Sequence, residues 1–106
     1  MDTVQHEMTV KAGETAQASV AVAGEVDASN ADRVRSAILD AAGNSGVKLD
    51  VDLGGVTFMD SSGLRAIADA YRELEAFGSG LVLRKVPHQV LRLVAISDIW
   101  AHLDVI

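Results

Sequence analysis

The chain has 106 residues, of which 49% are hydrophobic and 23% are charged, and this length is enough for one domain with its own core. Nine basic and fifteen acidic side chains give a net charge of −6 at pH 7. That balance argues against binding to nucleic acid or to an anionic membrane surface, because both need clustered Lys and Arg. Cysteine is absent, which excludes disulfides and thiolate chemistry. The three histidines are scattered, so no metal site is expected.

No apolar run approaches the roughly 20 residues of a membrane-spanning helix, and the N-terminus lacks the basic-then-apolar pattern of a secretion signal. We therefore expect an acidic cytoplasmic protein whose partners are other proteins. Residues 1–7 are polar, which predicts a flexible N-terminus. Residues 8–106 are expected to form one domain.

The first part of the chain predicts two strands and a helix. Met8 to Val10 form a candidate strand, and residues 18–23 alternate larger with smaller side chains as a strand does. Ser29 and Asp32 resemble a capping box. Apolar residues then recur at helical spacing up to a stop at Gly43.

Residues 47–53 give the clearest strand, because apolar side chains alternate strictly with charged ones and only one face is apolar. The glycine pair 54–55 is expected to break this strand before the apolar run 56–59. A second helical pattern begins at Leu64 and ends before Gly78.

Residues 81–83 predict a further strand, Pro87 suits the first turn of a short third helix, and residues 100–106 predict a last strand. The alternation of strands with helices predicts an α/β fold with a mostly parallel or mixed sheet, covered fully on one side only. The aromatic side chains are expected in the core or at its edge: Phe58, Tyr71, Phe77 and Trp100.

The most informative segment is Asp60-Ser61-Ser62-Gly63, which joins an apolar strand to the second helix. A serine at a helix N-terminus caps the helix, binds an anion or accepts a phosphate. One cap is enough, so three polar candidates in a row exceed what the helix needs. The apolar elements on both sides hold the segment on a rigid scaffold.

Enzyme-like uses of Ser61 have little support. A nucleophilic serine needs a base and an orienting group, and His88 and His102 are candidates by composition alone. The segment also lacks the flanking glycines of a nucleophile elbow. Neither a Walker loop nor a GxGxxG fingerprint is present, and no lysine lies nearby to neutralise nucleotide phosphates. A small hydrolase using Ser61 is therefore the third interpretation, and we expect neither catalytic residues nor a cofactor.

The segment Phe58-Met59-Asp60-Ser61-Ser62-Gly63-Leu64 resembles the phosphorylation motif of the bacterial anti-sigma factor antagonists, which are small STAS-domain proteins. Upstream, Gly24-Glu25-Val26-Asp27 resembles the G-E-[LIV]-D segment of that family, and residues 86–98 resemble its Pro-initiated short helix and turn. The resemblance covers the chain from about Met8 onward. It implies a STAS-like mixed β-sheet of four to five strands, packed with about three to four helices.

By this resemblance, Ser61 is the phosphoacceptor, Ser62 caps the second helix, and Asp60 positions the hydroxyl or contacts the partner. Arg65 occupies a position that is often small in relatives. The residues expected to bind the partner are Glu25, Asp27, Ser29, Asn30, Asp60, Ser61, Ser62, Gly63 and Arg65.

Members of the family bind an anti-sigma factor that is itself a serine kinase, and this binding frees a sigma factor. Phosphorylation by the kinase ends the interaction, and a metal-dependent serine phosphatase reverses it. The resemblance thus implies a binding protein and not an enzyme, and a monomer is one possible state of the free chain. The alternative is a STAS interaction module in a larger signalling or transporter-associated complex, without sigma-factor regulation.

Overall fold

The computed structural model describes residues 9–12, 19–43, 48–96 and 104–105. Strands and helices alternate along these residues after an initial pair of strands, as the sequence pattern predicts. The elements are β1 (Thr9–Ala12), β2 (Ser19–Val26), α1 (Ala31–Ala42), β3 (Lys48–Met59), α2 (Ser61–Ala76), β4 (Gly80–Arg84), α3 (His88–Ala95) and β5 (Asp104–Val105).

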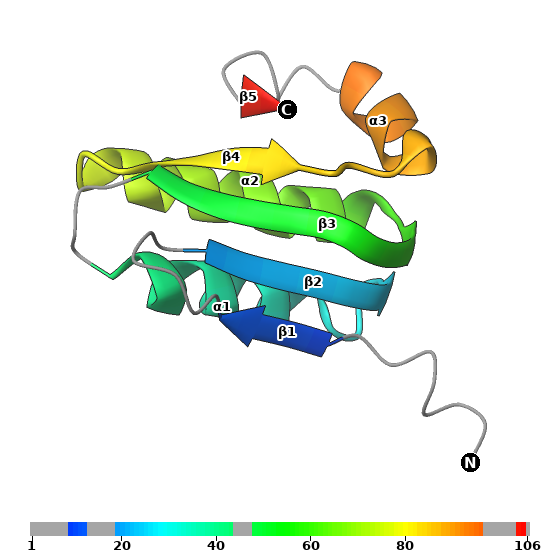
Figure 1. The fold of residues 1–106 in the computed structure, drawn as a ribbon, viewed down its shortest axis with the longest axis horizontal. Coiled ribbons are helices and arrows are strands. Elements are labelled where there is room, and N and C mark those ends of the chain that lie inside the picture. Colours follow the sequence, from blue (N-terminus) through cyan, green and yellow to red (C-terminus); the bar gives the residue numbers. More distant parts are fainter. Residues whose placement is uncertain (1–8, 13–18, 44–47, 97–103, 106) are drawn as a thin grey trace.

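The strands form one mixed sheet in the order β1-β2-β3-β4-β5 (Figure 1). β1 pairs with β2 in antiparallel orientation, whereas the pairs β2–β3, β3–β4 and β4–β5 are parallel. Each parallel pair needs a crossover connection, which α1 supplies between β2 and β3 and α2 between β3 and β4. The carboxyl ends of β2 and β3 therefore meet at one edge of the sheet, and the loops that follow them are neighbours.

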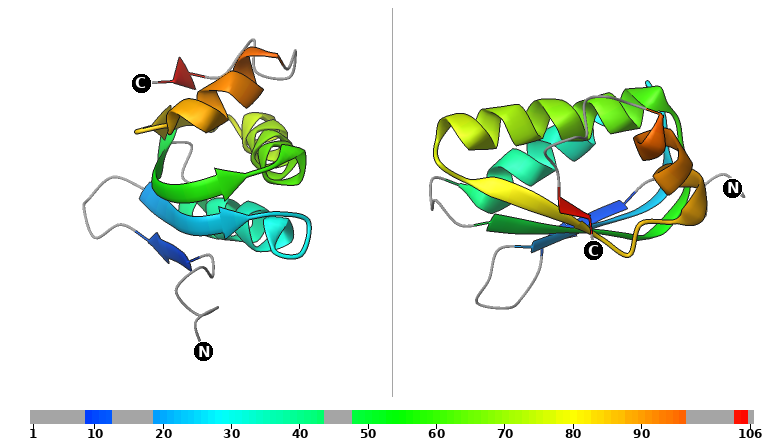
Figure 2. Two further views of the ribbon diagram at one scale, coloured as in Figure 1. Left: turned by 90° about the vertical axis from the view of Figure 1, so that its right-hand side faces the viewer. Right: turned by 90° about the horizontal axis from the view of Figure 1, so that it is seen from above.

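Helices α1 and α2 both lie on one face of the sheet, and α3 lies near the end where β3 and β4 finish (Figure 2). The core fills the space between that face and the two long helices. Its largest fully buried side chains include Leu49, Leu53 and Leu83 from the sheet and Ile38 and Ile67 from the helices. The alternation predicted for residues 47–53 is confirmed where it is described, since the apolar residues are buried and the charged ones are not.

The glycine pair 54–55 does not break the strand, so that prediction is wrong. β3 is continuous from Lys48 to Met59, and its pairing with β2 shifts register instead, between Ala21 and Ala23 and again after Gly24. A Cβ atom at Gly55 would lie 2.7 Å from the Cβ of Ala23, so the two backbones approach closely at this irregularity. Extra residues accommodated in this way change which face the following side chains occupy.

Two aromatic residues lie outside the core. Phe58, expected in the core or at its edge, is 48% exposed at the end of β3, so that expectation is wrong. Phe77 is 65% exposed just after α2, so its expected core position is also wrong. Tyr71 is partly buried against the core, as expected. The predicted core role of Trp100 lies outside the described residues.

Candidate functional site

The site begins at the N-terminus of α2, where Asp60 is the N-cap. The Asp60 backbone is extended, and its Oδ1 accepts hydrogen bonds from the backbone N–H of Ser62 at 2.9 Å and of Gly63 at 3.3 Å. The predicted capping role of Ser62 is therefore wrong, because Asp60 is the residue that precedes the first helical turn. The helix also begins at Ser61, three residues before Leu64, where the apolar pattern starts.

Ser61 is the first helical residue, and its side chain is exposed. Its hydroxyl makes no hydrogen bond with any residue that the structure describes. Ser62 is half-buried inside the first turn. The two serines are thus distinguished by their exposure, since the side chain of Ser61 is exposed and that of Ser62 is half-buried.

Gly63 fixes how closely the start of α2 approaches the sheet. It is buried, and a Cβ atom there would lie 2.7 Å from Val26 Cγ1 and 2.8 Å from Met59 Cγ. Both neighbours are the last residues of their strands. Any larger residue would push the helix away, so the glycine sets the position of Ser61 relative to the ends of β2 and β3.

The loop between β2 and α1 lies beside this helix start. The backbone N–H of Asp60 donates to the carbonyl of Val26 at 3.3 Å, which ties the two loops together. Asn30 braces the loop internally, since its Oδ1 accepts from Asp27 N and its Nδ2 donates to Glu25 O, both at 2.9 Å. The two segments that carry the sequence-predicted residues therefore lie side by side.

The predicted Ser29–Asp32 capping box does not form. Asn30 occupies the N-cap position of α1, without a side-chain cap hydrogen bond. Ser29 instead donates to Asp27 Oδ1 through its hydroxyl at 2.5 Å and through its backbone N–H at 2.9 Å. The bond from the Ser29 hydroxyl, followed by that from its N–H, lowers the pKa of the Asp27 carboxyl below its ordinary value.

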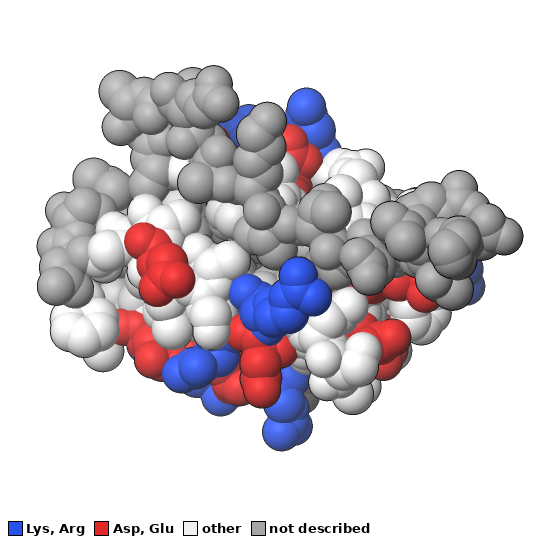
Figure 3. Space-filling model, turned by 90° about the horizontal axis from the view of Figure 1, so that it is seen from below, with Lys and Arg blue, Asp and Glu red and all other residues white. Residues whose placement is uncertain are grey.

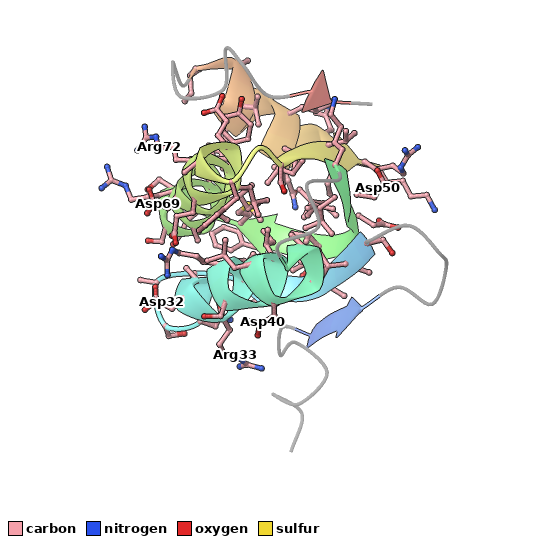
Figure 4. The ribbon with its side chains drawn as sticks, turned by 90° about the vertical axis from the view of Figure 1, so that its left-hand side faces the viewer. Asp32, Arg33, Asp40, Asp50, Asp69 and Arg72 are labelled. Carbon is pink, nitrogen blue, oxygen red and sulfur yellow. The ribbon has the colours of Figure 1, made fainter. Side chains whose placement is uncertain are left out.

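A shallow groove of about 200 Å³ runs between α1 and α2 next to this surface, and it includes Ser62 and Arg65. An ion pair between Arg35 of α1 and Glu73 of α2 crosses it farther along. Asp32 from α1 and Asp69 and Arg72 from α2 lie on the same side of the molecule in Figure 4. In the view from the β1 and α1 side, acidic and basic side chains intermingle over the described surface (Figure 3). The groove is therefore charged but of mixed sign.

The structure adds two residues at the end of β3 that the sequence did not indicate as parts of this surface. Phe58 presents an exposed ring two residues before the cap. Gln89 of α3 donates its Nε2 to Thr57 O at 2.6 Å, which links α3 to the end of β3. The alternation of residues 48–53, continued along the strand, puts position 58 on the same face as the exposed Lys48, and this is the sequence signal that could have indicated the exposure of Phe58.

The described residues contain no group of three or more His, Cys, Asp or Glu side chains placed to hold a metal ion. Within the same part of the chain, no helix combines the length and the apolar character needed to cross a membrane.

Comparison with known proteins agrees with this geometry. The family described as "Mlab, STAS domain" matches residues 10–103. The anti-sigma-B factor antagonist of Listeria monocytogenes is 33% identical over 90 residues, which are 85% of this chain and 79% of that protein. The crystal structure of an anti-sigma factor antagonist from Mycobacterium paratuberculosis matches with a TM-score of 0.76 and 25% identity, covering 94% of this chain and 86% of that one.

The unphosphorylated form of the anti-sigma factor antagonist SpoIIAA shares the fold, with a TM-score of 0.65, 19% identity and coverage of 92% of this chain and 87% of that one. The matched region contains the capped helix start and the β2–α1 loop. The resemblance seen in the sequence motifs is thus confirmed by the whole chain and by its fold. The protein belongs to the STAS-domain family of bacterial anti-sigma factor antagonists.

Proposed function

We propose that this chain binds an anti-sigma factor that is a serine kinase, that this binding releases a sigma factor, and that phosphorylation of Ser61 ends it. The observation that carries the proposal is the exposed Ser61 hydroxyl on the first residue of α2, beside an Asp60 that already caps the helix. Because the fold does not use this hydroxyl, it is available to a kinase. A metal-dependent serine phosphatase then restores the binding form.

The proposed partner face joins the β2–α1 loop to the start of α2. Its support is the Asp60–Val26 backbone hydrogen bond, which places the two segments side by side. Gly63 contributes through its backbone, since it is buried. The proposed face comprises Glu25, Asp27, Ser29, Asn30, Asp60, Ser61, Ser62, Gly63 and Arg65.

The proposed loss of binding on phosphorylation follows from the negative charge that the phosphate adds. In the kinase reaction, Ser61 Oγ takes the γ-phosphoryl group of ATP, ADP leaves, and the hydroxyl proton is released. The phosphate adds about −1.5 to −2 charges beside the Asp60 carboxylate. An uncompensated charge buried in an interface costs about 3 kcal/mol or more, which weakens binding more than a hundredfold. The fold tolerates the phosphate, because Ser61 is exposed at the positive end of the helix dipole.

We propose reversible binding in the bacterial cytoplasm, by a single STAS domain of residues 8–106, rather than catalysis. The exposed His88 is the first residue of α3 and makes no hydrogen bond to Ser61, so it does not act as a base for a nucleophile there. The 33% identical relative is an anti-sigma-B factor antagonist. That relationship favours sigma-factor regulation over a module of a transporter-associated or other signalling complex.

The test is incubation with Mg-ATP and each candidate anti-sigma factor kinase of the source organism, followed by intact-mass measurement and peptide mapping. We expect one phosphate on Ser61. Ser61→Ala should bind the kinase and remain unmodified, whereas Ser62→Ala, the matched control, should still be phosphorylated. Ser61→Asp should bind the kinase weakly.

Two outcomes would refute the proposal. One is equal affinity of the phosphorylated and unmodified proteins for the kinase. The other is a phosphate that maps to Ser62 while Ser61 stays free.

A further inference from the structure

Three backbone donors at the start of α2, the N–H groups of Ser62, Gly63 and Leu64, are already engaged. Asp60 Oδ1 accepts from Ser62 N and Gly63 N, and the carbonyl of Asp60 accepts from Leu64 N at 3.3 Å. A helix N-terminus normally offers such N–H groups to an anion. A phosphate on Ser61 would meet these three engaged N–H groups and a neighbouring carboxylate, with the N–H of Ser61 itself as a remaining donor, so a cationic side chain is needed to balance a charge of about −2.

Arg65 lies one helical turn beyond Ser61. Residues four apart share a helix face, with about 5–6 Å between their Cβ atoms, and the order acid first, base second is the favourable one. The Arg65 side chain is exposed and lines the groove that also includes Ser62. A guanidinium at this spacing reaches a phosphate on Ser61 without any movement of the backbone.

Arg65 also has no ion-pair or hydrogen-bond partner among the residues that the structure describes. Two other arginines on this side of the molecule have partners, since Arg35 pairs with Glu73 and Arg72 lies 3.7 Å from Asp69. No ion pair or hydrogen bond joins Arg65 to a residue that the structure describes.

The charged groups that share the groove with Arg65 are Asp32 and Arg35 of α1 and Asp69 of α2. The two carboxylates are singly charged and do not hold the Arg65 guanidinium. A phosphate that carries about two negative charges attracts it more strongly. We therefore expect the guanidinium to turn toward Ser61 only after Ser61 is phosphorylated.

We propose that Arg65 is the internal counter-ion of phosphorylated Ser61, so that modification both adds charge to the partner face and withdraws Arg65 from it. This inference rests on the proposed function in taking Ser61 as the phosphoacceptor. The pairing makes Arg65 a positioning residue that distinguishes the two forms of the protein: it is available to an acidic partner group before phosphorylation and is held by the phosphate afterwards.

The test installs phosphoserine at position 61 during translation, so that no native kinase is needed. The phosphate is titrated by ³¹P NMR in the otherwise unchanged protein, in Arg65→Gln and in the matched control Arg72→Gln. Because Arg65 favours the dianion, it lowers the pKa of the phosphate. We expect the phosphate of the Arg65→Gln protein to bind its titrating proton about twofold more tightly. The phosphate of the Arg72→Gln protein should titrate as in the otherwise unchanged protein. The Nε–Hε resonance of Arg65 should shift with the same midpoint.

Identical titrations of all three proteins would overturn the pairing, and so would equal effects of the two arginine substitutions. If native kinases leave Ser61 unmodified, the proposed function fails, yet the NMR titration still decides whether Arg65 receives the phosphate.

Discussion

Gly63→Ala should destabilise the protein, although alanine is the better helix former. A Cβ at this position meets Val26 Cγ1 at 2.7 Å and Met59 Cγ at 2.8 Å. Val26 is fully buried and β-branched, so its Cγ1 has little freedom to move, and Met59 is 4% exposed. Overpacking of this kind costs about 1–3 kcal/mol.

Helix propensity opposes that cost, since alanine is favoured over glycine by up to about 1 kcal/mol inside a helix. We expect a net loss of about 1 kcal/mol in the free energy of unfolding, equivalent to about 4–8 °C in Tm for a domain of this size. Equilibrium urea unfolding followed by circular dichroism measures it.

Gly80→Ala is the matched control, because the nearest atom to its added Cβ, Lys48 Cε, is 3.9 Å away. It should be neutral or slightly stabilising. If Gly63→Ala were as stable as the unmodified protein, the close approach of α2 to the sheet would not constrain position 63, and the argument that this glycine positions Ser61 would fail.

Two further predictions concern the carboxylates of the site. Asp60→Ala removes the N-cap of α2 and should lower the unfolding free energy by about 1 kcal/mol, measured by urea unfolding, whereas Asp60→Asn should retain most of it; an unchanged midpoint in Asp60→Ala would contradict the capping role. Ser29→Ala should raise the pKa of the Asp27 carboxyl toward its ordinary value, as followed by ¹³C NMR, because the hydroxyl bond that chiefly lowers it is lost. A carboxyl pKa that is lower in the folded than in the unfolded protein stabilises the fold at pH values above the unfolded-state pKa. This stability is lost as the pH falls through the folded-state pKa. Between neutral pH and that acidic range, the unmodified protein should therefore lose more stability than Ser29→Ala.

Local sequence patterns predicted those strands and helices in which the buried side chains recur at one regular spacing. The strict alternation in residues 48–53 identified the central strand, because one face of it contacts the helices and the other does not. The helical spacing after Asn30 likewise identified α1, with Val34 and Ile38 fully buried.

Local patterns were less informative where several side chains offer the same interaction. Asp60, Ser61 and Ser62 all carry a suitable acceptor for a helix cap, and the choice of Asp60 depends on where the chain leaves β3. The register shifts between β2 and β3, which accompany the continuation of β3 through Gly54 and Gly55, involve residues far apart in the sequence. Contacts between such distant residues are determined by the tertiary fold, and the spacing of apolar side chains along the sequence does not reveal them.

The hydrogen bond from Asp60 N–H to the carbonyl of Val26 has a consequence for the thermodynamics of recognition. It fastens the segment that carries the proposed phosphoacceptor, Ser61, to a loop that Asn30 also braces. A partner that docks here meets a preorganised surface, so little conformational entropy is lost on association. Affinity can then respond steeply to one covalent change, because no compensating rearrangement of the loops is available to absorb it.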